Sequence, residues 1–492
     1  MILIGLLAIP LVAAALSAVS RRRTMMEAVN LACFALIFLI ALALGSEVLA
    51  SGPVSLMDGF LYADSLSALV ILLNASVALL CSVYAVGYLR DDERSGAFGD
   101  DAAIGKLRKY YTLTPVFVFA MMLVCVSNNL GVMWAAIEAT TLASVFLVTF
   151  YGKVTSLEAA WKYAIIGSVG LSMALFGTII AYYSGHLLVG PDGISGLNWS
   201  VLAERASQLD KPTMRLAFIL VLLGYGTKAG LAPMHTWKPD AYSEAPVPSA
   251  AILSSAMLNC AIYGLVRFYI LTSRSVGPEF PGRLLLLFGI LSMGISVPFI
   301  LVQRNFRRLL AYHTIDHAGI MATALGIGGV LGPFGLMLHM TFHTVAKCLL
   351  FLCAGNVYQH FRTDLFRNIK GGVMRVMPIT GVIFLMAMLA IIGMPPFSLF
   401  QSEFIIVRAA FDGGHSLAGV LFIVFGTGVF AGAVLHVGSL VLGSSETAVV
   451  APRPWRDTSL VVLGTILVVI GFWLPGPLLT LIRSAAKVIT GA

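Results

Sequence analysis

The chain has 492 residues, of which 59% are hydrophobic and only 11% are charged. A soluble globule of this size needs more polar surface than that, so the composition excludes a soluble enzyme and indicates an integral membrane protein. The formal net charge of +8 arises mostly in loops, without a basic, aromatic-interleaved soluble face. We therefore expect no nucleic-acid partner.

Apolar runs long enough to cross about 30 Å of hydrocarbon recur along the whole chain. They predict an all-α protein with about fourteen transmembrane helices, near 2–19, 27–48, 64–89, 112–127, 129–151, 159–183, 214–233, 247–270, 284–302, 308–330, 333–358, 378–411, 417–443 and 457–485. The run 378–411 is too long for one straight crossing and contains Pro395 and Pro396, so a break is expected there.

The loop charges predict the orientation. With the N-terminus outside, nineteen lysines and arginines, Lys238 and Lys370 among them, fall in cytoplasmic loops and seven on the other side. This asymmetry follows the positive-inside rule and predicts both termini outside. The first apolar run precedes its arginines, the reverse of a cleavable signal, so we expect it to be retained.

The sequence offers no cofactor motif. Its six cysteines all lie in apolar runs, without the paired spacing that holds zinc or an iron–sulfur cluster, and no Walker loop or dinucleotide fingerprint is present. We expect the cysteines to be packing residues, and no cofactor, metal or catalytic residue of redox chemistry in this chain.

Five basic residues lie within or at the ends of predicted spans: Lys162, Lys228, Arg267, Lys347 and Arg408. A charge at the bilayer centre costs at least about 2.5–3.5 kcal/mol, so such residues usually face the bundle interior and mark ion or proton paths. We expect Arg267 and Arg408, late in their helices, to snorkel toward the interface. Lys162 fits either interpretation.

Glu138 lies well inside the fifth predicted helix. An isolated carboxyl there would be protonated, whereas one near an ammonium can ionise. We therefore predict that Glu138 and Lys228 interact and exchange between neutral and ionised states. The alternative is a static ion pair that holds the fifth and seventh helices together.

In the second half, His339, His343 and Lys347 recur every four residues and should form one stripe about 12 Å long. Imidazole both donates and accepts a proton near neutral pH, which suits a relay. Further titratable groups in this half are His313, Asp316, His317 and Glu403. Zinc is disfavoured because no Glu follows His339 or His343 directly, as it does in zincins. A haem between two histidines and plain core histidines are the other interpretations.

Backbone breaks favour transport over a static bundle. The seventh predicted helix contains several glycines and ends at Pro233, and the twelfth contains Gly393 and the double proline. Interrupted spans at corresponding places in two halves indicate an inverted-repeat transporter with sites near the midplane. We predict two inverted five-helix repeats, helices four to eight and nine to thirteen, and divide the chain into 1–111, 112–270, 284–443 and 457–492.

Several segments carry a specific resemblance. They read KAGLAPMHTWKPDA at 228–241, EAPVP at 244–248, RLLAY at 308–312 and HxxxHxxxKxxLFL at 339–352. These segments resemble the antiporter-like subunits of respiratory complex I and of multi-subunit cation/proton antiporters, over nearly the whole chain. Within that family, YHTIDH at 312–317, EAAWKY at 158–163 and LNCA at 258–261 most resemble the F-type component of membrane-bound hydrogenase-4 and the C-type component of formate hydrogenlyase.

The resemblance implies fourteen helices, broken helices seven and twelve, and a proton half-channel in each repeat. It places relay roles on Glu138, Lys228, Lys347 and Glu403. Together with the stripe of His339 and His343, these residues form the predicted proton relay. Secondary relay candidates are Lys162, His235, Ser254, Asn259, His313, Asp316 and His317. Where complex I subunits carry a histidine or lysine on helix eight, this chain has Ser254 and Asn259, neither of which titrates near neutral pH.

The resemblance also implies partners and a location. We expect a multi-pass subunit of a prokaryotic inner (plasma) membrane, bound to other membrane subunits and to a peripheral redox arm. A NiFe centre and iron–sulfur clusters would belong to those partners, and the chain itself would move protons. The alternatives are a subunit of NADH:quinone oxidoreductase or of a multi-subunit cation/proton antiporter, and an ion-translocating partner in inorganic carbon uptake. Two further alternatives are a self-sufficient cation/proton exchanger and a purely structural anchor. Proton and sodium transport remain open, although the histidines and lysines favour protons.

Overall fold

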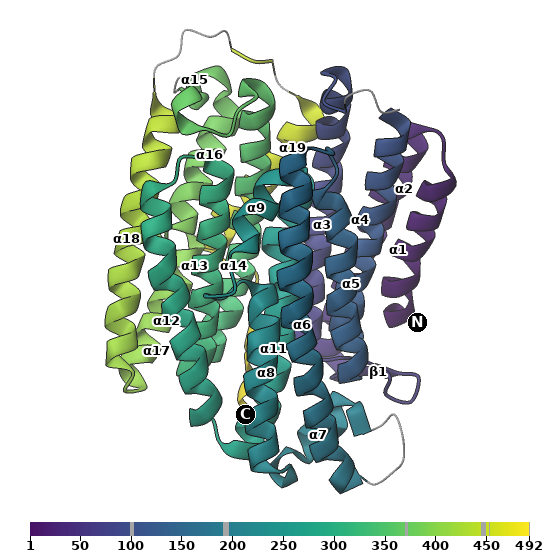
Figure 1. Ribbon diagram of the computed structural model, residues 1–492, viewed down its shortest axis with the longest axis vertical. Helices are drawn as coiled ribbons and strands as arrows, with labels where there is room; N and C mark the ends of the chain where they lie inside the picture. The colour runs from purple at the N-terminus through teal and green to yellow at the C-terminus, as the bar shows by residue number, and fades with distance from the viewer. Residues whose placement is uncertain (99–102, 190–195, 370–371, 444–448, 452, 492) are drawn as a thin grey trace.

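A computed structural model describes residues 1–492 except 99–102, 190–195, 370–371, 444–448, 452 and 492. Its helices run side by side along one axis, and most are long enough to cross a bilayer (Figure 1). This confirms the predicted all-α membrane architecture. One of the nineteen residues assigned to the cytoplasmic side, Lys370, lies outside the described residues.

The elements follow the chain as a succession of long helices. In the first half they are α1 (Ile2–Val19), α2 (Arg23–Ser51), the strands β1 (Val54–Leu56) and β2 (Leu61–Ala63), α3 (Ser65–Arg94), α4 (Ala103–Val126), α5 (Leu130–Val148), α6 (Val154–Val189), α7 (Trp199–Glu204), η2 (Ala206–Gln208), α8 (Lys211–Ala229), α9 (Trp237–Glu244), α10 (Val247–Ile252), η3 (Leu253–Met257) and α11 (Leu258–Val276). In the second half they are α12 (Glu279–Val302), α13 (Phe306–Ile327), α14 (Leu331–Phe361), η4 (Phe366–Asn368), α15 (Val373–Val376), α16 (Pro378–Ile391), α17 (Ser398–Asp412), α18 (Ser416–Leu442), α19 (Pro454–Phe472) and α20 (Gly476–Thr490).

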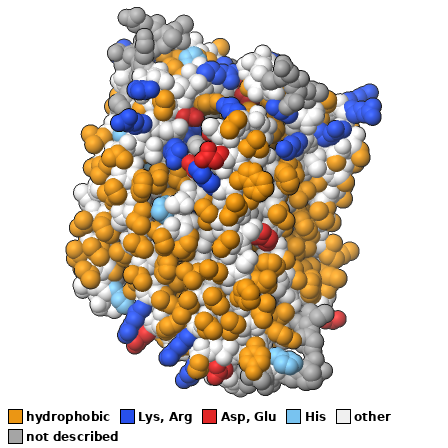
Figure 2. Space-filling model, in the orientation of Figure 1, with side chains coloured by type: hydrophobic (Ala, Val, Ile, Leu, Met, Phe, Trp, Pro, Cys, Tyr) orange, Lys and Arg blue, Asp and Glu red, His pale blue; other side chains and the backbone are white. Residues whose placement is uncertain are grey.

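Within the described residues, eleven uninterrupted helices are long and apolar enough to span a membrane. The other three predicted crossings carry charges or are divided, and correspond to α8, α13, and α16 with α17. Both termini lie toward the same end of the bundle (Figure 1), as an even number of crossings requires. Figure 2 shows lysines and arginines gathered mainly at the opposite end, above a broad hydrophobic band.

Both predicted breaks are present and have the same backbone cause. Helix α8 ends at Ala229, where Gly230 takes a left-handed conformation with φ of +76°, and the chain resumes as α9. Helix α16 ends at Ile391, where Gly393 has φ of +68°, and α17 begins at Ser398. Glycine adopts this conformation without the cost that a side chain adds, and the prolines that follow cannot donate the next helical hydrogen bond.

Three local features differ from the predicted pattern. The last predicted helix is divided into α19 and α20 at residues 473–475, because Pro475 cannot continue the hydrogen-bonded ladder. The eighth crossing contains a π-helical turn, η3, between α10 and α11. Strands β1 and β2 form an antiparallel hairpin in the register Val54 with Ala63 and Leu56 with Leu61.

Each half of the bundle contains a helix crossing so close that glycine is required. A Cβ at Gly224 of α8 would lie 2.6 Å from the Gly170 carbonyl oxygen of α6, and one at Gly289 of α12 would lie 2.8 Å from the Gly319 carbonyl oxygen of α13. Small residues at such crossings let backbones approach in a bilayer, where packing rather than hydrophobicity drives association. The α6–α8 contact places residues of both helices around the end of α8.

Candidate functional site

Lys228 is buried in the last turn of α8. Its ammonium donates one hydrogen bond to the Thr141 hydroxyl of α5 and another to the Tyr163 hydroxyl of α6, each at 2.8 Å. It also lies 5.1 Å from the centre of the Tyr163 ring. The partners are neutral, so the charge is solvated locally but not neutralised by a direct contact.

Glu138 lies on α5, close to Lys228 but not bonded to it. Its Oε1 accepts a hydrogen bond from the Ser168 hydroxyl at 2.9 Å, and its Oε2 has no partner among the described residues. The two groups interact electrostatically, yet no ion pair within 4.0 Å joins them in the described part of the chain. The static Glu138–Lys228 ion pair, the predicted alternative, is therefore absent from this conformation.

Lys347 is buried at the centre of α14 and donates a hydrogen bond of 2.6 Å to the Leu310 carbonyl oxygen of α13. Asp316, also on α13, lies within electrostatic range of this ammonium and accepts a hydrogen bond from Ser296 at 3.2 Å. The second half thus repeats the arrangement of the first, with a lysine on hydrogen-bond acceptors and a carboxyl nearby.

Three imidazoles form a compact cluster beside Lys347. His317 of α13 lies between His339 and His343 of α14, with ring centres 5.1 and 5.0 Å away. Its Nδ1 shares a 2.9 Å hydrogen bond with His339 Nε2, and His339 Nδ1 continues to the Ser402 hydroxyl at 3.0 Å. A hydrogen-bonded chain therefore runs from α13 through α14 to the broken helix α17.

Glu403 follows Ser402 on α17 and lies beside this hydrogen-bonded chain. Its carboxyl lies directly over the break, since a Cβ at Gly393 would collide with Glu403 Oε2. Its ligand atoms and those of His317 and His339 lie within 4.8 Å of one another, a grouping that a transition metal could draw together. Because the two imidazoles already bond to each other, a metal would have to break that bond, and we interpret them as a hydrogen-bonded pair with Glu403 nearby.

Several imidazole nitrogens here are buried without a partner in the described residues: both of His313, both of His343 and Nε2 of His317. A buried polar group left unpaired costs roughly 1–3 kcal/mol, so static core histidines would normally be paired. Buried polar groups in proteins pair with protein or with ordered water, so these nitrogens are where bound water is expected.

Two residues of the eighth predicted crossing, which α10, η3 and α11 form, are polar but do not titrate near neutral pH. Asn259 is buried and donates to the Thr344 hydroxyl of α14 at 2.9 Å and to Asn74 of α3 at 3.3 Å. Ser254 lies in the π-helical turn and donates to the Ala251 carbonyl at 3.1 Å. Both residues lie between the two halves without offering a proton carrier.

Two other candidates lie away from this line. Lys162 is half exposed and bonds to Glu158 at 2.6 Å and to Asp240 at 3.1 Å, in a surface hollow of about 170 Å³ that Arg308 also lines. His235 is buried beside Phe299, with ring centres 6.4 Å apart, in the segment that joins α8 to α9. The Lys162 hollow opens where α6, α9 and α13 meet.

Lys238 was not among the predicted site residues, because the sequence pattern assigned it to a cytoplasmic loop. The side chain is buried, and its ammonium donates to the Ala229 carbonyl oxygen at the end of α8. The assignment was wrong because a polar segment after a broken helix looks like a loop, whereas α9 packs against α6 and α13 inside the bundle. The signal available was the position of Lys238, one turn beyond the helix-breaking Pro233.

Arg267 also corrects an expectation. It does not snorkel, because its guanidinium is buried and binds both carboxylate oxygens of Asp64, at 2.7 and 2.8 Å. It stacks over Trp199 at 4.0 Å and Tyr263 at 4.8 Å. Arg408, in contrast, is exposed and pairs with Asp412 of its own helix at 3.2 Å, as expected for a snorkelling residue.

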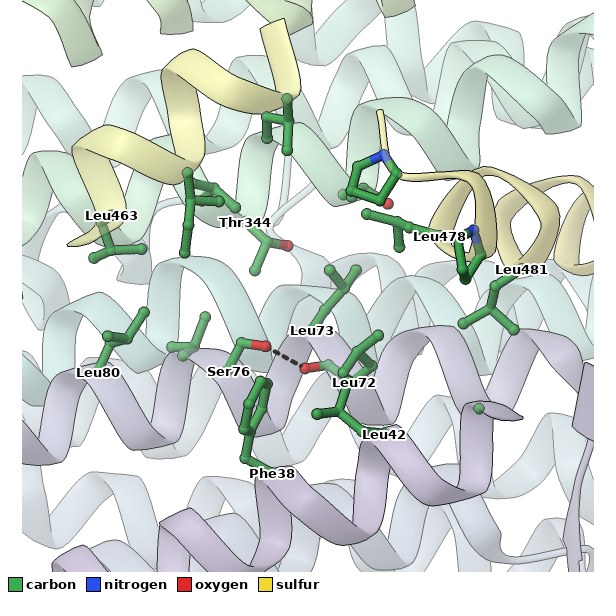
Figure 3. Close-up of a pocket in the computed structure, with 18 of the residues that line it drawn as sticks. Phe38, Leu42, Leu72, Leu73, Ser76, Leu80, Thr344, Leu463, Leu478 and Leu481 are labelled. Carbon is green, nitrogen blue, oxygen red and sulfur yellow. Dashed lines mark hydrogen bonds between the residues drawn. The ribbon is translucent and has the colours of Figure 1, made fainter. Parts of the chain in front are cut away.

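A cavity of about 370 Å³ lies among α2, α3, α14, α19 and α20 (Figure 3). Leucines and Phe38 make up most of its labelled lining, with Ser76 already bonded to the Leu72 carbonyl at 2.7 Å. Thr344 reaches the cavity, but its hydroxyl donates to Met340 and accepts from Asn259. Apolar cavities of this kind stay dry, so a proton path does not run through this one.

The fold and this buried line of ionisable groups define an antiporter-like membrane subunit. The chain belongs to the NADH:quinone oxidoreductase/Mrp antiporter transmembrane family, whose model matches residues 127–430. This confirms the family resemblance of its lysine and histidine segments.

Individual relatives agree with the family. The chain is 35% identical over 394 residues to the hydrogenase-4 component F homolog of Methylacidiphilum infernorum (isolate V4), a match that covers 80% of each protein. It is 29% identical over 372 residues to hydrogenase-4 component B of Escherichia coli (strain K12), covering 73% of this chain and 52% of that protein. Its fold resembles a chain of the membrane-bound sulfane sulfur reductase, an archaeal respiratory membrane complex, with a TM-score of 0.87, 23% identity and coverage of 99% and 98%.

Proposed function

We propose that this chain is the proton-translocating membrane subunit of a redox-driven complex of the group 4 hydrogenase type, as in hydrogenase-4 and formate hydrogenlyase. The observation that carries the proposal is a set of ionisable groups beside two helix breaks. Five of them are buried, namely Lys228, Lys347, His343, His317 and His339, and two are partly exposed, namely Glu138 and Glu403. The hydrogenase-4 relatives support the type of complex.

In this proposal, protons move by pairwise electrostatics. Two unit charges about 10 Å apart in a protein of effective dielectric 20 interact by roughly 1.7 kcal/mol, enough to change a protonation equilibrium more than tenfold. Ionisation of Glu138 therefore favours the ammonium form of Lys228, and protonation of Glu138 favours release of a proton from Lys228 Nζ. Lys347 and Asp316 form the corresponding pair, and the imidazoles pass the proton between Lys347 and Glu403.

Partners and location follow from the same proposal. The NiFe centre and iron–sulfur clusters would lie in a peripheral arm and in neighbouring subunits, and this chain would be a multi-pass subunit of a prokaryotic inner membrane with both termini outside. Glu138 and Glu403 are partly exposed on the sides of the bundle. They are therefore accessible to neighbouring membrane subunits that relay the redox event.

The test uses the complex that co-purifies with the full-length chain. Hydrogen evolution from reduced methyl viologen reports the redox activity, and a pH dye inside liposomes reports proton movement. Lys228→Met should keep hydrogen evolution and lower proton translocation by roughly 100-fold. The matched control is Lys211→Met, at an exposed position on the first turn of the same helix.

Two outcomes would contradict the proposal at different levels. Unchanged translocation in Lys228→Met would contradict the relay itself. A co-purified complex that oxidises NADH and evolves no hydrogen would keep the relay but replace the hydrogenase type by the complex I type.

A further inference from the structure

Lys238 is buried at the break between α8 and α9. Its stem lies against Gly230, where a Cβ would collide with Lys238 Cε and come within 2.8 Å of its Nζ. The ammonium bonds the Ala229 carbonyl oxygen, which the end of α8 leaves without a helical partner. No ion pair to Lys238 occurs among the described residues, so a buried ammonium is present without a counter-ion.

The surroundings place this ammonium between the two halves. It lies 5.9 Å from the ring centres of both Trp237 and Tyr242. Trp237 stacks on Tyr163 with ring centres 4.4 Å apart, and Tyr163 is the hydroxyl partner of Lys228. On the other side, Tyr242 packs edge-on against Phe351 of α14 at 5.9 Å.

Phe351 lies one helical turn beyond Lys347, so this aromatic layer joins the surroundings of both relay lysines. Lys238 interacts electrostatically with Lys228 on one side and with His343 and Lys347 on the other. The eighth crossing, formed by α10, η3 and α11, by contrast places Ser254 and Asn259 between the halves, and both are hydrogen-bonded and non-titrating.

We propose that Lys238 is the proton-carrying link between Lys228 and the Lys347–histidine cluster. It would take the place of a titratable residue on the eighth crossing, formed by α10, η3 and α11. The inference rests on the proposed proton-relay function. One proton is exchanged at each step: the neutral amine of Lys238 accepts a proton released by Lys228, and its ammonium then releases that proton toward Lys347 or His343. The reverse order carries protons the other way.

A purely structural role predicts something different. A cation at the end of α8 stabilises the helix dipole and satisfies one carbonyl, whether or not it ever releases its proton. A neutral hydrogen-bond donor of similar size would then replace Lys238 as well as a titratable one. The two roles are separated by a pair of substitutions that differ in proton exchange and little in size.

The experiment compares Lys238→His with Lys238→Gln in the co-purified complex, with Lys211→Gln as an exposed control. Proton translocation per hydrogen evolved from reduced methyl viologen is measured in liposomes, after the amount of assembled complex has been matched by gel filtration. We expect Lys238→Gln to lose most translocation and Lys238→His to exceed it by roughly fivefold or more, because only imidazole exchanges a proton.

Equal translocation by the two variants, whether high or low, would overturn the role of Lys238. Lys228→Met, measured in parallel, keeps the two proposals apart. If it loses translocation while Lys238→His and Lys238→Gln behave alike, the relay stands and the link through Lys238 fails. If Lys228→Met pumps normally, the relay fails first.

Discussion

Two buried cations on neighbouring helices behave in opposite ways. Arg267 of α11 is fully satisfied by a bidentate carboxylate, a hydroxyl from Ser67 at 3.0 Å and two aromatic faces. Lys228 of α8 has two neutral hydroxyl partners and a carboxyl that lies near it without touching it. Both side chains are buried to the same degree.

The difference separates a structural charge from one that can change state. A guanidinium never loses its proton in a protein, and a bidentate carboxylate fixes it further. An ammonium whose hydrogen-bond partners are neutral loses its proton more readily, so the ionisation state of a nearby carboxyl can change its protonation equilibrium. Burial alone therefore does not distinguish a fixed charge from a candidate relay residue, and the proposed relay role of Lys228 depends on its neutral partners.

The largest effect on stability should come from Arg267→Met. It leaves the Asp64 carboxylate buried and unpaired, which should lower the free energy of unfolding by about 3–5 kcal/mol. SDS-induced unfolding of the purified chain measures this. Arg408→Met removes an exposed guanidinium and should stay within about 0.5 kcal/mol. Equal losses in the two variants would contradict a structural role for the Asp64–Arg267 pair.

The break beside Lys238 should be the next most sensitive feature. Gly230→Ala adds a Cβ at a position with positive φ and against the Lys238 stem, and should cost about 1–3 kcal/mol of unfolding free energy. Gly426→Ala in α18 meets nothing within 4 Å and serves as the control. If Gly230→Ala were as stable as that control, Lys238 would not be held against the break as described.

Of these three variants, Lys347→Met should change stability least, although it should strongly lower proton translocation. Lys347→Met removes a buried ammonium bonded to a backbone carbonyl that Thr314 also contacts. The free energy of unfolding should stay within about 1 kcal/mol of the parent, or rise. Lys347 contacts a carbonyl oxygen and no carboxylate, so its removal leaves no ion-pair partner behind. Proton translocation should fall as in Lys228→Met. A loss of stability like that of Arg267→Met would make Lys347 a structural residue.

Local rules were enough to predict much of this protein. Hydrophobic run length gave the crossings, and the glycines and prolines near 230 and 393 gave both breaks, because these effects act through the backbone of adjacent residues. The four-residue spacing of His339, His343 and Lys347 placed them on one face of α14, since helical geometry is also local. The family followed from contiguous segments.

Partners from distant segments were decided by the tertiary structure. Arg267 meets Asp64 across 203 positions, and His317 joins the α14 histidines across 22. Hydropathy could not distinguish a loop lysine from Lys238, which is buried only because α9 packs into the bundle. The sequence by itself determined where the helices run and stop. Only the packing of helices far apart in the chain decided which buried charges meet a carboxylate and which meet neutral acceptors, because a partner is defined in space and not along the chain.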